Sequence, residues 1–174
     1  NMKAILVLVI CLTVTILQVK LKEPCPKDLE VDVKAFKSLW YVRAAKPDIF
    51  DEFDHIEGNL DQVNEKTGEV SGTVTANING TYDEHDVSLI VSGRNLTSKY
   101  STHGENFSAL YEVLAFDDTF YIAYGKPSAD SKGLVLIHYK DQCPGNDTQD
   151  KVKKALKNVC LDFKDFSEDK KIDC

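Results

Sequence analysis

The side chains that most often carry chemistry are spread thinly along this chain. Its histidines are His55, His85, His103 and His138. No two of them show the H-x-H or H-x-x-x-H spacing that places two imidazoles on one metal ion. His138, in the segment "LIHY", is the only histidine flanked by core-type residues. The sequence therefore predicts no metal site, and we interpret His138 as a hydrogen-bonded histidine near the wall of the fold.

Acidic residues gather in the segment "DIFDEFD" at 48–54. Their spread along one loop favours a solvated lid over an acid/base pair. No serine lies in a G-x-S-x-G motif, and no glycine-rich phosphate loop is present. We therefore expect no catalytic residues, no enzyme activity and no cofactor.

The first residues carry the pattern of a targeting segment. Positions 4–17 form an uncharged stretch between Lys3 and Lys20 that is too short for a membrane span. We predict a signal peptide over 1–21, with an approximate cleavage point, and a single domain over 22–174. The chain should thus be secreted and not stably inserted in a membrane. Its net charge of -7 predicts no nucleic-acid partner, because an acidic surface repels phosphates.

Cysteine usage agrees with an extracellular chain. Cys11 lies in the predicted signal peptide, which leaves Cys25, Cys143, Cys160 and Cys174. An even number of cysteines in a secreted domain indicates two disulfides, for which three connectivities exist.

Acceptor motifs for N-glycosylation indicate which residues face water. The N-x-S/T motifs begin at Asn79, Asn95, Asn106 and Asn146. A glycan must point to solvent, so a strand residue next to a used acceptor points inward.

Residues 39–142 alternate apolar and polar side chains in short runs separated by turn residues. Such runs predict antiparallel strands joined by hairpins. We expect an all-β fold, an eight-stranded antiparallel up-and-down barrel, with a seven-stranded sandwich as the alternative. The expected strands are 39–45, 54–63, 69–77, 84–92, 94–101, 107–116, 119–126 and 133–141.

After Pro144 the apolar period becomes helical. Val152, Leu156 and Val159 repeat on one side of a helix expected over 147–161. Asn146 or Asp147 could cap its start, and its apolar stripe should pack on the outside of the barrel. We expect Cys25 to pair with Cys143, because the N-terminus and the end of the last strand should meet at one barrel end, and Cys160 to pair with Cys174.

Alternation also predicts which side chains line the barrel. Outward Asn95 and Thr97 send Leu96 inward, an outward Glu112 sends Val113 inward, and polar His85 and Ser88 help to place Val87 inside. The result is an apolar lining with a few phenols, which suits a fatty acyl chain. The expected lining is Val42, Ala44, Ile56, Leu60, Val70, Val74, Val87, Leu89, Val91, Leu96, Tyr100, Tyr111, Val113, Phe120, Ile122 and Tyr124.

The combination of a signal peptide, an early tryptophan, eight alternating strands and a late helix resembles the lipocalin family. The family's Gly-x-Trp motif matches Ser38, Leu39 and Trp40, with serine in place of glycine. The resemblance implies that a basic residue at the end of the last strand, here Lys140, lies over Trp40 at the barrel floor.

Within that family, several segments resemble the lipocalin milk proteins of a viviparous cockroach. They are "KEPCP", "KPDIF", "VSGR", "GLVLIHY" and "VKKALKNVCLD". The resemblance implies a secreted, N-glycosylated protein that holds a fatty acid in its barrel and feeds embryos.

Two other functions remain open. One is a carrier or scavenger of another small hydrophobic ligand, such as a pheromone, a bilin, an amine or a haem held by His138. An amine pocket should contain an inward carboxylate, whereas alternation places Glu112 outside. The other is a storage protein whose barrel is filled by its own side chains and has no cavity of a few hundred cubic ångströms.

Overall fold

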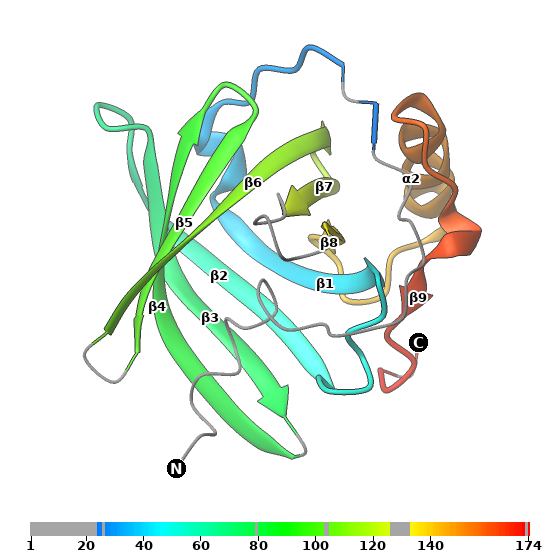
Figure 1. The fold of residues 1–174 in the computed structure, drawn as a ribbon, viewed down its shortest axis with the longest axis horizontal. Helices are drawn as coiled ribbons and strands as arrows, with labels where there is room; N and C mark the ends of the chain where they lie inside the picture. The colour runs from blue at the N-terminus through cyan, green and yellow to red at the C-terminus, as the bar shows by residue number, and fades with distance from the viewer. Residues whose placement is uncertain (1–23, 26, 79, 103–104, 126–132, 173) are drawn as a thin grey trace.

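The computed structural model describes residues 24, 25, 27–78, 80–102, 105–125, 133–172 and 174. The predicted signal peptide and Asn79 lie outside these residues. Within them, strands that are sequential in the chain pair antiparallel around a barrel (Figure 1). The predicted eight-stranded barrel is confirmed, and the sandwich is excluded.

The elements of this part of the chain are η1 (Val33–Phe36), β1 (Ser38–Lys46), β2 (His55–Asn64), β3 (Glu69–Ile78), β4 (Thr81–Ser92), β5 (Asn95–Thr102), β6 (Glu105–Asp117), β7 (Phe120–Gly125), β8 (Leu134–Tyr139), α2 (Asn146–Asn158), η2 (Phe163–Asp165) and β9 (Ser167–Glu168).

Strand β1 closes the barrel. Its first part, from Ser38 to Tyr41, pairs with β2, and its second part pairs with β8. The register with β8 shifts between Val42 and Ala44. An irregularity of this kind changes which side chains point inward along the strand. As a result, Val42 and Ala45 pack inside the barrel, while Ala44 packs on its outer face.

Two glycines make tight links between neighbouring strands. Gly68 ends the link from β2 to β3 with a φ of 66°, and Gly93 lies in the turn from β4 to β5 with a φ of 59°. A side chain with a Cβ atom rarely adopts this left-handed conformation. The segment "NEKTG" at 64–68 therefore turns where glycine permits it.

Helix α2 covers one side of the barrel from outside, as Figure 1 shows. Val152 and Leu156 are fully buried against outward side chains of β7 and β8, such as Ile122 and Ile137.

The helix ends at Asn158, three residues before the expected end at 161, and Cys160 follows in the left-handed conformation with a φ of 64°. Its N-cap is Gly145, without a side-chain cap bond, so the capping role expected for Asn146 or Asp147 is wrong. Neither this helix nor any other described one is long and apolar enough to cross a membrane.

The C-terminal segment is fixed to the outer face of β1. Nη1 of Arg43 lies 3.3 Å from the buried Oδ2 of Asp169, and the backbone amide of Asp169 donates to the carbonyl of Arg43. Lys171 forms an ion pair with Asp54 just before β2. Because Arg43 and Asp169 are both largely buried, each charge depends on the other.

The disulfide pairing differs from the expected one. Cys25 is bonded to Cys160 and Cys143 to Cys174, so the expected pairs Cys25–Cys143 and Cys160–Cys174 are wrong. The N-terminal segment runs along the end of α2, where the amide of Cys25 donates to the carbonyl of Val159. The prediction placed this segment beside the end of β8, and nothing in its sequence marks contact with the helix.

We predict that removing either disulfide lowers the free energy of unfolding, and that the longer loop matters more. The Cys25–Cys160 bond spans 135 residues and the Cys143–Cys174 bond spans 31. Loop-closure entropy gives losses of about 5 and about 4 kcal/mol for the two paired Cys→Ser variants. Urea unfolding measures both, and a larger loss for the shorter loop would contradict the expectation.

Candidate functional site

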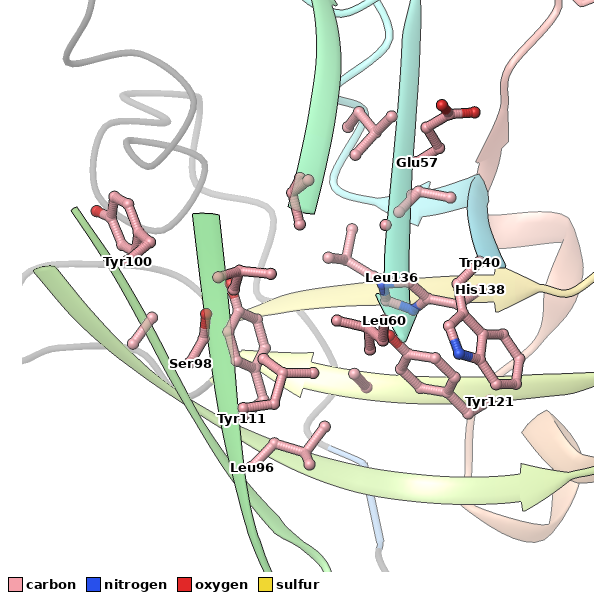
Figure 2. A pocket seen from close by; sticks show the side chains of 18 of the residues that line it. Trp40, Glu57, Leu60, Leu96, Ser98, Tyr100, Tyr111, Tyr121, Leu136 and His138 are labelled. Carbon is pink, nitrogen blue, oxygen red and sulfur yellow. The ribbon is translucent and has the colours of Figure 1, made fainter. Parts of the chain in front are cut away.

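A cavity of about 160 Å³ lies inside the barrel. Its wall is mostly aliphatic and aromatic, with a small number of polar groups, as is usual for a ligand pocket. Figure 2 shows these side chains converging from strands on opposite sides of the barrel. The cavity is lined by Trp40, Val42, Ile56, Glu57, Gly58, Leu60, Val74, His85, Val87, Leu89, Leu96, Ser98, Tyr100, Ala109, Tyr111, Tyr121, Ala123, Leu136 and His138.

Most of the side chains expected to face inward do so. Val70, Val91 and Val113 pack inside the barrel in the same hydrophobic cluster as Trp40 but do not reach the cavity. The expected residues that line the cavity itself are Val42, Ile56, Leu60, Val74, Val87, Leu89, Leu96, Tyr100 and Tyr111.

Four of the expected lining residues face the opposite way. Ala44, Phe120 and Ile122 are buried beneath α2, and Tyr124 packs against the same cluster. On β1 the register shift reverses Ala44. On β7 both faces are covered, by the barrel interior on one side and by α2 on the other, so no polar alternation marks the outside.

Four of the lining residues that the sequence prediction omitted come from the last strands. Tyr121 and Ala123 of β7 and Leu136 and His138 of β8 all face the cavity. The expected position of Lys140 could have revealed the inward residues of β8. If Lys140 lies over Trp40, then His138 and Leu136, two and four positions earlier in the strand, share its face.

Two further lining residues could also have been predicted from the sequence. An outward Asn106 likewise implies an inward Ala109, since the two differ by an odd number of positions. The outward orientation used for His85 is wrong, because His85 has the same parity as Val87 and also lines the cavity.

Trp40 closes one end of the barrel. Its indole Nε1 donates a hydrogen bond of 2.8 Å to the carbonyl of Phe36 in η1, and its ring meets Tyr121 edge-on, with centroids 4.8 Å apart. Nζ of Lys140 lies 5.1 Å from the indole centroid, the arrangement that the resemblance to lipocalins implies. A cation at this distance is attracted by the negative face of the ring. The floor is therefore held by one residue that contacts η1, β7 and the end of β8.

Replacing Trp40 should damage the floor more than removing its cation. Trp40→Phe deletes the bond to Phe36 and leaves a small void, which we expect to lower the free energy of unfolding by about 2 to 3 kcal/mol. Lys140→Met keeps the packing and should cost about 1 kcal/mol or less. Chemical denaturation of both variants gives the comparison, and equal losses would show that the indole has no special role.

The loop at 47–54 packs at the other end of the barrel. It follows β1, whereas η1 precedes β1, so the two lie at opposite ends of that strand. Ile49, Phe50 and Phe53 are buried against inward residues such as Leu136. The acidic Asp48, Asp51 and Glu52 are exposed. The solvated lid expected here is thus an amphipathic lid, whose acids face water and whose apolar residues fill the mouth.

His138 is a polar residue of the cavity wall. Its ring stacks on Tyr121 with centroids 4.1 Å apart and an angle of 8° between the planes. Its Nδ1 is buried and has no hydrogen-bond partner in the described part of the chain. Burial lowers the pKa of His138 to about 3, so the imidazole is neutral at pH 7. Burial also raises the pKa of the Tyr121 phenol.

Two other histidines near the cavity lie beside carboxylates, although Nε2 of His85 is buried and makes no hydrogen bond of acceptable geometry within the described residues. Nε2 of His85 lies 3.0 Å from Oδ2 of Asp83, and Nε2 of His55 lies 2.9 Å from Oε2 of Glu57. In Figure 2 the Glu57 carboxylate points away from Trp40, Tyr121 and His138. The described residues contain no group of three or more His, Cys, Asp or Glu side chains that could hold a metal ion.

The buried carboxylate of the barrel wall is also neutralised. Glu112 forms an ion pair with Arg94 and does not line the cavity. The guanidinium of Arg94 in turn donates 3.0 Å to the carbonyl of Lys27 in the N-terminal segment. This acid therefore holds the wall to the N-terminal segment and faces away from any ligand.

The low pKa of His138 predicts an acid-sensitive fold. The unfolded chain binds a proton at His138 below about pH 6.5, whereas the folded chain does so only near pH 3. This contribution to stability is therefore present above pH 6.5 and falls as the pH is lowered, by about 2 kcal/mol at pH 5.

The variant His138→Phe keeps a stacked ring and should lose this part of the pH dependence. Urea unfolding at pH 6.5 and at pH 5 compares the two proteins. If both proteins lose the same free energy of unfolding between these two pH values, His138 has a near-normal pKa in the folded chain.

The glycosylation motifs lie on the outer surface wherever they are described. Asn95 at the start of β5, Asn106 in β6 and Asn146 at the start of α2 are all exposed. Each can thus present a glycan to solvent, and their modification stays a prediction.

No protein-family model matches the sequence, and no curated protein matches it. Solved structures do match the fold. The major allergen Per a 4 from cockroaches is 17% identical, with 82% of this chain and 90% of that chain covered and a TM-score of 0.66. The tryptamine complex of the amine-binding protein of Rhodnius prolixus is 14% identical, with 87% and 88% covered and a TM-score of 0.65. Lobster apocrustacyanin A1 is 14% identical, with 83% and 88% covered and a TM-score of 0.62.

These structural neighbours are lipocalins, and the chain has the lipocalin fold. The identities show the fold alone and leave the ligand open. The particular resemblance to cockroach milk proteins rests on the sequence segments given above.

Proposed function

We propose that this protein is a secreted, non-enzymatic carrier of a small hydrophobic ligand, which it encloses in the barrel. The observation that supports this most directly is the apolar cavity inside the barrel, which Trp40 helps to line. Neighbouring structures include proteins described as binding biogenic amines, which supports a carrier role for the fold. The two disulfides are consistent with an oxidising, extracellular compartment.

The cavity favours a compact and uncharged ligand. A cavity of about 160 Å³ is close to the 150 Å³ that holds benzene in an engineered protein core. The Glu57 carboxylate already binds His55, so no unpaired carboxylate among the described lining residues awaits an amine. A haem is far larger than this cavity.

A fatty acid and a nutritive role for embryos form the more specific part of the proposal. They are supported by the sequence segments that resemble cockroach milk proteins and by the apolar lining. A long acyl chain needs more room than a cavity of about 160 Å³ offers, so we expect neighbouring buried residues such as Ile49, Phe50 and Phe53 to move outward when it enters. A storage role without a ligand is the alternative, favoured by the small size of the cavity.

Filling the cavity should abolish ligand binding. Ala109→Leu adds a branched side chain inside the barrel, whereas Lys99→Leu adds the same side chain at an exposed position of β5. We expect the inward variant to weaken binding of a fluorescent apolar probe at least tenfold and the outward variant to leave it unchanged. Equal binding by both variants would place the probe outside the barrel.

Organic extraction of the purified protein, with native mass spectrometry before and after, tests the fatty acid directly. We expect a bound lipid in the native protein, and uptake of added oleate after extraction. Hydrogen exchange should then increase in the lid at 47–54 on oleate binding. Absence of both lipid and uptake would restrict the protein to compact ligands or to storage.

A further inference from the structure

An open groove of about 880 Å³ crosses the outer face of the barrel from β2 to β6. Neighbouring strands lie about 4.8 Å apart, so the groove spans roughly 19 Å from its first strand to its last. That length accommodates several sugar rings or another extended polar chain. The strand register places one outward polar or charged side chain of each strand in a single row across the groove: Gln62, Ser71, Ser88, Lys99 and Ser108.

The shape of this face arises where β2 meets β3. The register between the two strands shifts between Leu60 and Gln62. An irregularity of this kind bends a strand and increases its local twist. Beside it lies Gly72, where a Cβ atom would fall 1.9 Å from the backbone oxygen of Asn59. Glycine therefore lets β3 approach the irregular part of β2, and the sheet bends at this edge of the groove.

The side chains of the groove suit a ligand with many hydroxyl groups. Thr73 and Asp86 lie opposite each other on β3 and β4, next to the row that contains Lys99. Asp86 and Lys99 are exposed. A carboxylate accepts hydrogen bonds, an ammonium group donates them, and a hydroxyl does both. The hydroxyls of a sugar can pair with all three kinds of group.

A glycosylation motif lies at the β6 end of the same groove. Asn106 and Ser108, the first and last residues of the motif, both line it. The Ser101 hydroxyl on β5 donates a hydrogen bond to Oδ1 of Asn106. This bond draws the Asn106 amide from β6 towards β5, over the groove. The amide nitrogen, which carries the glycan at such a motif, is thus placed where the groove begins.

We propose that the groove is a carbohydrate-binding site occupied by the glycan of Asn106, whose sugars lie across β5 and β4 and hydrogen-bond Lys99 and Asp86. The inference rests on the predicted glycosylation of Asn106 and is independent of the carrier function. It distinguishes this glycan from the one predicted at Asn146. Asn146 begins α2, which Figure 1 shows on the opposite side of the barrel from β5.

The test measures how quickly each glycan is removed from the folded, secreted protein. A peptide N-glycosidase cleaves the bond between the asparagine and the first sugar, and mass spectrometry of the peptides follows each site. We expect release from Asn106 to be about tenfold slower than from Asn146, because the sugars must first leave the groove. After denaturation the two rates should be similar. Equal rates in the folded protein, or a secreted protein without a glycan at Asn106, would overturn the proposal.

Two matched variants separate binding in the groove from simple shielding of Asn106 by its strand. Asp86→Ala removes an exposed carboxylate of the groove, and Glu84→Ala removes an exposed carboxylate from the same face of β4 that does not line it. Surface substitutions of this kind change stability little. We expect Asp86→Ala to speed release at Asn106 roughly threefold to tenfold and Glu84→Ala to leave it unchanged. The same rate in both variants would contradict a glycan held by the groove.

Discussion

The hydrogen bond from the indole of Trp40 to the carbonyl of Phe36 is the constraint on which the closed barrel depends. It joins η1 to β1, and the same ring contacts Tyr121 on β7 and lies under Lys140 after β8. The first and last parts of the barrel thus meet at one side chain. Because strand β1 pairs with both β2 and β8, a floor fixed at its start also fixes the register in which the barrel closes.

Alternation predicted the inward side chains correctly where only one face of a strand is covered. On β5, for example, exposed Asn95 and buried Leu96 follow the simple pattern. It failed where the sequence contains no polar face, as on β7, whose outer residue Ile122 and inner residue Ala123 are both buried. It also failed at the register shift before Ala44, which depends on how β1 fits β8 and has no local sequence signal.

The two ends of the barrel are built differently. The floor is built from large rings and a cation, whereas the lid at 47–54 is a single loop whose apolar residues enter the mouth. Loops of this kind open at lower free energy than the strands that carry them. Exchange with solvent should therefore occur at the lid, and the Lys171–Asp54 ion pair connects the lid's last residue to the C-terminal segment.

The two disulfides overlap along the chain, because Cys143 lies within the Cys25–Cys160 loop and Cys174 lies beyond it. A protease that cuts the backbone once, anywhere between Cys25 and Cys174, therefore yields two fragments that remain covalently joined. Release of a peptide requires a second cut or reduction of a bond. The molecule can consequently tolerate a nick without losing any part of its barrel.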